Sequence, residues 1–241
     1  MIISKDSYLR RPPKKLNAKQ ASTFNAITYS VDICNISYER LHLNLLNIEE
    51  NLKTKKYIYS EFFLDAWSII NSSTVFLNLI TRHFKEIDNS DLIEIKKAKK
   101  IRNTNQHLDE RVEEVFMLKN LPIYGSLSWR HNLSSPDECN LILLSAGIFT
   151  HHDTFDTYLS PGISSGKEIE NIMLRSVERK KNDFEDLSVC LDKLIEELKV
   201  FVLKLEAIFT EQIEREEGTN DVERHGSNIF ILFPRVKVTE S

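Results

Sequence analysis

The residues best suited to chemistry in this chain are Arg102, Asn103 and His107, which lie close together in the sequence. An arginine keeps its charge and can bind two phosphate oxygens with parallel hydrogen bonds. A histidine with an ordinary pKa of about 6.5 can give or take a proton near neutral pH. The three side chains are therefore suited to handling a phosphodiester.

A helix that ran unbroken through this stretch would turn by about 100° per residue and separate an apolar stripe from a polar arc of about 140°. The stripe would contain Ile101, Leu108, Val112 and Val115, and the arc Arg102, Asn103, Gln106, His107 and Glu110. Asn103 would then be an i,i+4 neighbour of His107 and could orient its imidazole or share its ligand. A single phosphate is hard for both Arg102 and His107 to reach from one straight helix. Either the helix breaks here or a second copy of the chain completes the site, and we favour the second copy.

The segment Arg102-Asn103-Thr104-Asn105-Gln106-His107 resembles the signature of the HEPN domains (higher eukaryotes and prokaryotes nucleotide-binding). Their ribonuclease members carry an arginine, often followed by a polar residue, about four to six residues before a histidine. The resemblance implies an all-α bundle that dimerises so that two motifs face one another. It also implies a metal-independent endoribonuclease, an activity common in toxin-antitoxin and phage-defence systems. Asp109 stands where many HEPN toxins have a tyrosine.

The mechanism implied by the resemblance is attack of a ribose 2′-hydroxyl on the neighbouring phosphate. His107 would act as general acid or base, Arg102 would stabilise charge in the transition state, and Asn103 would position His107 or the phosphate. Such a reaction needs no metal and yields a 2′,3′-cyclic phosphate, so DNA should resist it. We expect no cofactor.

Charged residues near the motif are candidates for supporting it. The basic run formed by Lys96, Lys97, Lys99 and Lys100 could contact RNA, although such runs are often only solvated surface. The same holds for a second basic run at positions 10–15. Asp65 lies among apolar residues and needs a basic partner if it is buried. It forms either a structural ion pair or a contact that orients Arg102, while Asp109 and Glu110 could support His107.

Other constellations carry weaker signals. His131, His151, His152 and Asp153 include residue types that bind zinc or manganese, but neighbouring histidines in an extended segment point to opposite faces. We therefore expect no metal site. Trp67 and Trp129 are expected to pack in the core rather than stack on bases. Tyr124 and Arg130 could extend an RNA surface, or simply lie on an exposed strand.

Composition limits the class of protein. With 241 residues, of which 41% are hydrophobic, the chain can bury one sizeable core, and we expect a single domain over residues 1–241. A formal net charge of -4 gives no global basic field, so RNA would have to be bound by local patches. Three scattered cysteines, no secretory signal and no long apolar run predict a cytoplasmic protein without a membrane span.

The distribution of proline and glycine divides the chain. Residues 18–120 contain neither, which predicts helices at about 18–52, 57–84 and 90–119. Residues 121–164 predict a β-containing insertion, with a hairpin of strands at 124–130 and 141–150. An apolar seam at steps of three and four, from Phe184 to Ile208, predicts a long bundle helix over 165–217. A last strand is expected at 228–238, and the fold class is therefore mainly α, an elaborated HEPN-like bundle.

These features lead to two functional hypotheses. The first is a homodimeric RNase that acts as a toxin, with an antitoxin protein as partner, or as a defence effector. The second is a non-catalytic helical-bundle protein that binds or interacts and keeps the motif as a structural network. A nucleotide-binding protein without nuclease activity is a further alternative.

Overall fold

The computed structural model describes residues 1–48, 59–107, 124–132, 139–146, 168–180, 183–217 and 223–226. These residues form the helices α1 (Ala18–Leu46), α3 (Ser60–His83), α4 (Ile93–Asn105) and α6 (Leu191–Glu217). They also form the strands β1 (Ser126–Asn132), β2 (Cys139–Ser145), β3 (Ile169–Lys180) and β4 (Asp183–Cys190). The architecture is a mixture of helices and an antiparallel sheet, so the expectation of a mainly α bundle is wrong.

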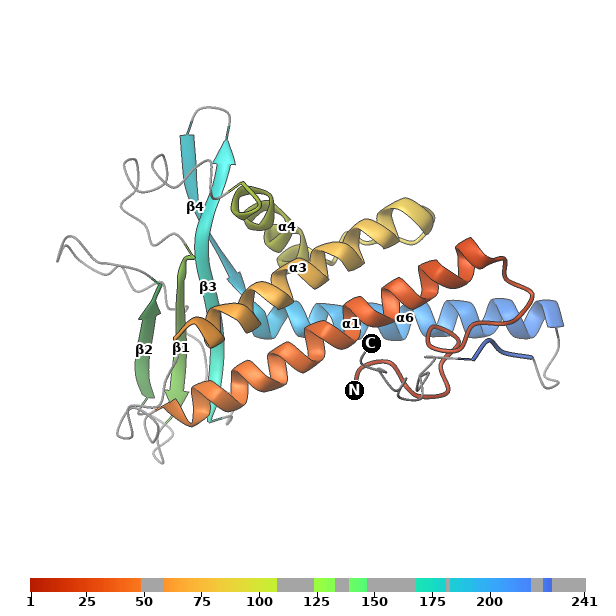
Figure 1. Cartoon of the computed structure of the whole chain (residues 1–241), viewed down its shortest axis with the longest axis horizontal. Helices are drawn as coiled ribbons and strands as arrows, with labels where there is room; N and C mark the ends of the chain where they lie inside the picture. Colours follow the sequence, from red (N-terminus) through yellow and green to blue (C-terminus); the bar gives the residue numbers. More distant parts are fainter. Residues whose placement is uncertain are drawn as a thin grey trace, which may run out of the picture.

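The three long helices lie beside one another, and the sheet closes one end of the molecule (Figure 1). The strand order is β2-β1-β3-β4, with every neighbouring pair antiparallel. One cluster of buried apolar side chains includes members from the N-terminal segment, the four helices and β1, β3 and β4. The sheet therefore belongs to the same core as the helices.

Local signals place the start of α1 where the sequence predicts it. The Asn17 side chain accepts a hydrogen bond from the Gln20 backbone N–H at 3.0 Å, and the Gln20 side chain accepts one from the Asn17 N–H at 3.0 Å. This reciprocal cap satisfies two donors that the first turn of a helix leaves free. The predicted β-hairpin is also confirmed, because β1 and β2 pair with Leu127 opposite Leu144.

The predicted helix over 165–217 is wrong in its first half. Ile169–Lys180 and Asp183–Cys190 are strands, and only Leu191–Glu217 is helical. Phe184 and Leu187, assigned to the helical seam, lie in β4. Three residues apart, they point to opposite faces of a strand. The seam continues correctly through α6, where its residues Leu191, Leu194, Leu198, Phe201 and Leu205 are buried.

The helix α4 is shorter than the helix predicted at 90–119. It begins at Ile93, and Asn105 is its last residue. No side chain of the preceding turn caps it; instead the Glu197 carboxylate on α6 accepts hydrogen bonds from the backbone N–H groups of Glu94 and Ile95 at 2.9 and 3.2 Å. The start of α4 therefore depends on a distant helix.

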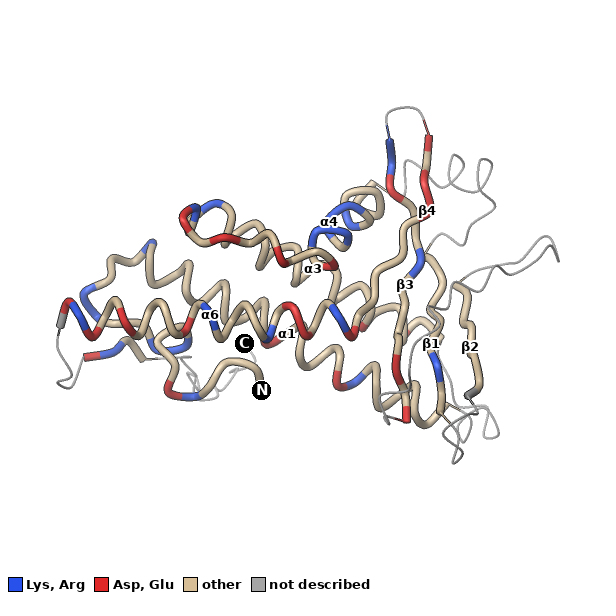
Figure 2. Tube along the Cα trace, turned by 180° about the vertical axis from the view of Figure 1, so that it is seen from behind, with Lys and Arg blue, Asp and Glu red and all other residues tan. Residues whose placement is uncertain are grey.

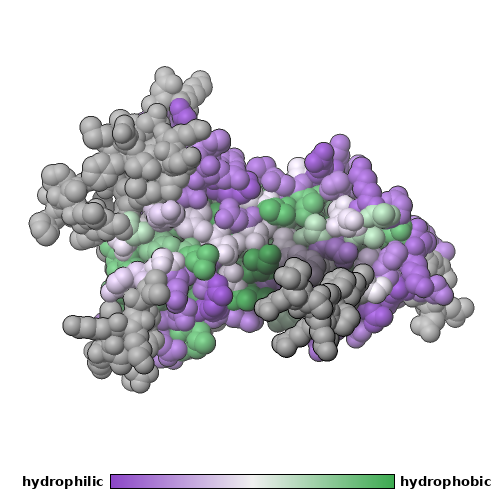
Figure 3. All heavy atoms as spheres, in the orientation of Figure 1, coloured by the Kyte–Doolittle hydropathy of each residue, from purple (hydrophilic) through white to green (hydrophobic). Residues whose placement is uncertain are grey.

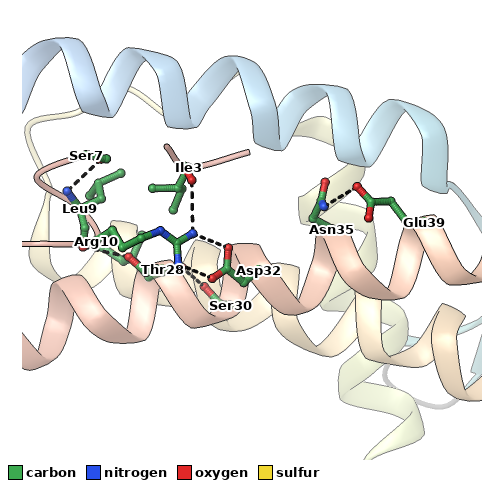
Figure 4. A network of polar contacts seen from close by, with 10 residues as sticks. Ile3, Ser7, Leu9, Arg10, Thr28, Ser30, Asp32, Asn35 and Glu39 are labelled. Atoms are coloured by element: carbon green, nitrogen blue, oxygen red, sulfur yellow. Dashed lines mark hydrogen bonds and ion pairs between the residues drawn. The ribbon is translucent and has the colours of Figure 1, made fainter. Parts of the chain in front are cut away.

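The N-terminal segment packs against α1 and does not present its basic run as a free patch. Arg10 donates two hydrogen bonds to Asp32 at 2.7 and 2.8 Å and a third to the Ile3 carbonyl (Figure 4). Lys14 and Lys15 form ion pairs with glutamates near the end of the chain. Arg10, Lys14 and Lys15 thus already have acidic partners within the chain.

Among the helices of the described residues, α3 alone is long and apolar enough to cross a membrane by length and composition. Two thirds of its apolar window, 67%, is buried inside the molecule. Its burial is that of a helix in the middle of a core. The strand expected at 228–238 lies outside the described residues, as does much of the predicted insertion.

Candidate active site

The motif lies on the last turn of α4 and the residues directly after it. Arg102 is half-buried, and its Nε makes no hydrogen bond with any described residue. Asn103, the next residue, is exposed. Buried nitrogen donors in folded proteins nearly always have a partner, so this one is a candidate for binding an anion.

His107 is exposed and lies beyond the end of α4, not on it. The backbone N–H of Gln106 donates to the Arg102 carbonyl at 2.9 Å, and that of His107 turns back to the Thr104 carbonyl at 3.3 Å. The i,i+4 pairing of Asn103 and His107 on one continuous helix is therefore a wrong expectation. A break in the helix or a second copy of the chain was expected to let Arg102 and His107 share a phosphate. The structure shows the first of these, since α4 ends before His107.

Thr104 anchors this turn to the sheet, a role that sequence reasoning missed. Its side chain is buried, and its hydroxyl accepts a hydrogen bond from the Arg179 backbone N–H of β3 at 3.0 Å. Ile101, one turn earlier, is fully buried in the core. Both contacts hold the helix end in place while Asn103 and His107 face outward. The only sequence signal for this anchoring role was the spacing of apolar and polar residues along α4.

The lysines that precede the motif cluster on α4, which stands out in blue near the end of the sheet (Figure 2). Lys96 donates to the carbonyls of Asn89 and Ser90, Lys97 pairs with Glu94 at 2.7 Å, and Lys100 pairs with Glu178 at 3.3 Å. Lys99 is half-buried. Intramolecular partners offset part of this positive charge, and the RNA-binding role of the lysines stays a prediction.

Asp65 is buried as expected, but its partner is Arg40 of α1. The carboxylate accepts hydrogen bonds from Arg40 Nε at 2.8 and 2.9 Å, and from Nη2. The structural ion pair is thus present, and no described contact joins Asp65 to Arg102. Asp109 and Glu110, the other supporting candidates, lie outside the described residues.

A cavity of about 940 Å³ opens between the first turns of α3, the end of α4 and the end of β2. Its lining is mostly apolar and includes four aromatic residues. Two lining residues carry buried polar atoms without a hydrogen-bond partner among the described residues, Asn105 through Nδ2 and Ser145 through Oγ. The residues that line the cavity are Tyr59, Ser60, Glu61, Phe63, Leu64, Trp67, Asn105, Tyr124, Leu144, Ser145 and Ala146. Sequence reasoning did not find this cavity, because its walls come from four separate segments.

The rival constellation of possible metal ligands is described only in part. Within the described residues no cluster of three or more potential metal ligands occurs. His131 lies 3.7 Å from Glu168, while residues 151–153 fall outside the described ranges. Arg130 is buried beside Glu170 at 3.4 Å, so it does not extend an RNA surface as one hypothesis held.

Cys34 and Cys190 are not suited to nucleophilic chemistry. Cys34 and Cys190 are free thiols, and both are buried. Burial raises the pKa of each thiol above its ordinary value because the charged thiolate loses solvation. Neither Cys34 nor Cys190 is activated as a thiolate.

Comparisons with models of protein families, with curated proteins and with solved structures give no significant match to this chain.

Proposed function

We propose that this protein is a metal-independent endoribonuclease that uses Arg102, Asn103 and His107. The proposal is carried by one observation: α4 ends after Asn105, which keeps Arg102 on an anchored helix and sets His107 on an exposed turn. Arg102 and His107 are therefore not held on one straight helix, the arrangement from which both could hardly reach a single phosphate. The resemblance of these residues to the HEPN signature supports the same chemistry.

In the proposed reaction the 2′-hydroxyl of a ribose attacks the adjacent phosphorus and the bond to the 5′-oxygen breaks. The imidazole of His107 takes the hydroxyl proton or supplies the proton to the leaving oxygen. Arg102 donates hydrogen bonds to the phosphate oxygens as negative charge grows on them, with Asn103 positioning the phosphate or His107. The products carry a 2′,3′-cyclic phosphate and a free 5′-hydroxyl.

A second copy of the chain is part of the proposal. Along α1, Tyr29, Ile33, Ile36 and Leu43 are large apolar side chains that remain exposed, at steps of four, three and seven. This spacing is that of a coiled-coil seam, which buries apolar residues against another helix. We propose that two copies pair along α1 as a cytoplasmic homodimer. A toxin held by an antitoxin protein, or a defence effector, is the biological role that fits such an RNase.

The test is cleavage of a mixed RNA pool in EDTA, with the new ends identified by ligation selective for cyclic phosphates. Wild type is expected to cleave RNA but not DNA of the same sequence. Arg102→Ala and His107→Ala are each expected to lower the rate by roughly a hundredfold or more. Arg82→Ala and His83→Ala, at an exposed arginine and histidine on α3, are matched controls that should retain the wild-type rate.

A non-catalytic binding protein is the alternative, and the intramolecular pairing of Lys96, Lys97 and Lys100 favours it. Lysines with internal partners contribute less to the electrostatic attraction that brings RNA to an enzyme. Absence of cleavage by folded, partner-free protein, or cleavage that survives His107→Ala, would support this alternative over the RNase.

A further inference from the structure

We infer that the cavity at the end of α4 binds one unstacked purine base of single-stranded RNA, next to the phosphate that the motif handles. The inference rests on the proposed function, since it names the part of the substrate that this site would select. It concerns residues other than Arg102, Asn103 and His107, to which the proposed mechanism assigns roles.

Aromatic side chains supply the apolar walls of the cavity. Trp67 and Phe63 are almost fully buried in the helix α3, and the Trp67 indole N–H donates to the Tyr124 carbonyl at 3.0 Å. This hydrogen bond holds the indole in one orientation. Tyr124, at the entrance to β1, remains 54% exposed at the cavity. Stacking on such side chains is how proteins hold the splayed bases of single-stranded RNA.

Two polar groups supply specificity within these walls. The Nδ2 of Asn105 and the Oγ of Ser145 are buried without a hydrogen-bond partner among the described residues. Such unpaired groups lower the stability of the fold unless a ligand forms hydrogen bonds with them. A side-chain amide offers one donor and one acceptor side by side, the pattern that matches the adenine edge formed by N6 and N7. A hydroxyl can serve either a donor or an acceptor on the base.

The position of Asn105 connects the cavity to the chemistry. It lies between Arg102 and His107 and on the same last turn of α4. In an RNA strand each base is joined to its neighbouring phosphates only through one ribose, so the base and the phosphate of a nucleotide lie close together. A nucleotide with its phosphate near Arg102 and His107 can therefore extend its base toward Asn105. A purely apolar ligand would leave Asn105 and Ser145 unpaired, so a base fits the lining better.

The probe for this inference is a set of four 2′-O-methyl hexanucleotides, one for each base, which cannot be cleaved because the attacking hydroxyl is blocked. Their affinity is measured by fluorescence anisotropy with the full chain. We expect oligo-A or oligo-G to bind roughly tenfold or more tightly than oligo-U and oligo-C, with oligo-A the tightest.

Three variants assign the preference to the cavity. Asn105→Ala should lower the purine affinity by roughly tenfold and leave the pyrimidine affinity nearly unchanged. Tyr124→Ala removes a ring on which any base can stack, so it should lower the affinity for all four oligomers. Asn105→Asp keeps the shape but replaces the NH2 donor with an acceptor, so it should shift the preference away from adenine. The control is Leu203→Ala, at a residue that is 63% exposed on α6, outside the cavity and outside the α1 seam. Circular dichroism checks that each variant is folded.

The outcomes separate this inference from the nuclease. Purine-selective binding that depends on Asn105, by a protein that cleaves no unmodified RNA, supports the base site and contradicts the proposed reaction. Cleavage that depends on His107, without base preference in binding or in cut positions, supports the reaction and overturns the base site. Equal affinity of all four oligomers for wild type and Asn105→Ala also overturns it.

Discussion

The Arg40–Asp65 pair shows how one contact determines what a charged residue does. Asp65 is only 1% exposed, and its carboxylate is held by a fork of arginine nitrogens from the neighbouring helix. A carboxylate buried in this way has already lost its hydration. Removal of its partner would leave an uncompensated charge in the core, which is strongly destabilising. The role of Asp65 that follows is to join α1 to α3.

Arg40→Leu should therefore lower the free energy of unfolding by about 1–3 kcal/mol, because it leaves the Asp65 carboxylate buried and unpaired. Urea denaturation followed by circular dichroism measures the change. Arg11→Leu, at an exposed arginine of the N-terminal segment, is the control and should change stability by no more than about 0.5 kcal/mol. Equal effects of the two substitutions would contradict a structural role for the pair.

At the scale of elements, the start of β1 depends on a glycine. Gly125 has a φ of 84°, and a Cβ built there would lie 2.3 Å from the Arg175 carbonyl oxygen of β3. A side chain would therefore be strained by the backbone conformation and would push the two strands apart. Only glycine allows β1 to enter the sheet at this point.

Gly125→Ala is expected to lower the thermal midpoint and the free energy of unfolding by about 2–3 kcal/mol. Gly226→Ala is a matched control, since a Cβ at Gly226 meets nothing within 4 Å. Differential scanning calorimetry of both variants makes the comparison. A Gly125 variant as stable as the Gly226 variant would show that the strands accommodate the methyl group.

Glu197, whose carboxylate caps the start of α4, is expected to make the stability of the fold depend on pH. Burial is the largest cause that raises the pKa of this carboxyl above its ordinary value near 4.5, and the hydrogen bonds from Glu94 and Ile95 only partly oppose it. Between the ordinary and the raised pKa, the folded state holds more protons at Glu197 than the unfolded state. The contribution of Glu197 to stability is therefore present at low pH and is lost as pH rises through this window.

Glu197→Gln cannot ionise, so the stability of this variant relative to wild type should improve as pH rises from about 4 to 8. Denaturation midpoints measured across this range at constant ionic strength test the slope. Glu196→Gln, at the exposed neighbour on α6, serves as the control. A difference between Glu197→Gln and wild type that does not change with pH would mean that the carboxyl titrates alike in both states.

At the scale of the whole molecule, the exposed apolar seam of α1 predicts the oligomeric state. Apolar patches interrupt the polar surface over α1 and α3 on the face shown in Figure 3. Pairing with a second helix would remove the exposed apolar side chains of the seam from water. Two copies joined here would bring two motifs into one assembly, as the proposed RNase requires.

Ile36→Glu should convert a dimer into a monomer, because it puts a charge in the middle of the seam, where Ile36 is 58% exposed in the single chain. Sedimentation velocity over a range of concentrations measures the change. Val200→Glu is the matched control, at a residue that is 59% exposed on α6 and away from the seam. Wild type that sediments as a monomer at all concentrations would remove the second copy from the proposal.

Local sequence determined the features whose causes lie within a few residues. The Asn17 and Gln20 cap sets the start of α1, the turn composition between 130 and 141 indicates the β1–β2 hairpin, and the apolar spacing from Leu191 onward indicates α6. The same spacing extended into Phe184 and Leu187 was misleading, because an apolar pair three residues apart also occurs in strands. The Arg102 to His107 motif was likewise found from its residues, but the end of the helix within it was not.

Tertiary structure alone decided what depends on residues far apart in the chain. Glu197 caps a helix 103 residues earlier, Arg40 pairs across 25 residues, and Thr104 is tied to a strand 75 residues later. The same holds for β3, whose backbone groups pair with β1 and β4 rather than along a helix. Such contacts exist only once the core has formed, because the free energy that stabilises them comes from burial shared by all the elements.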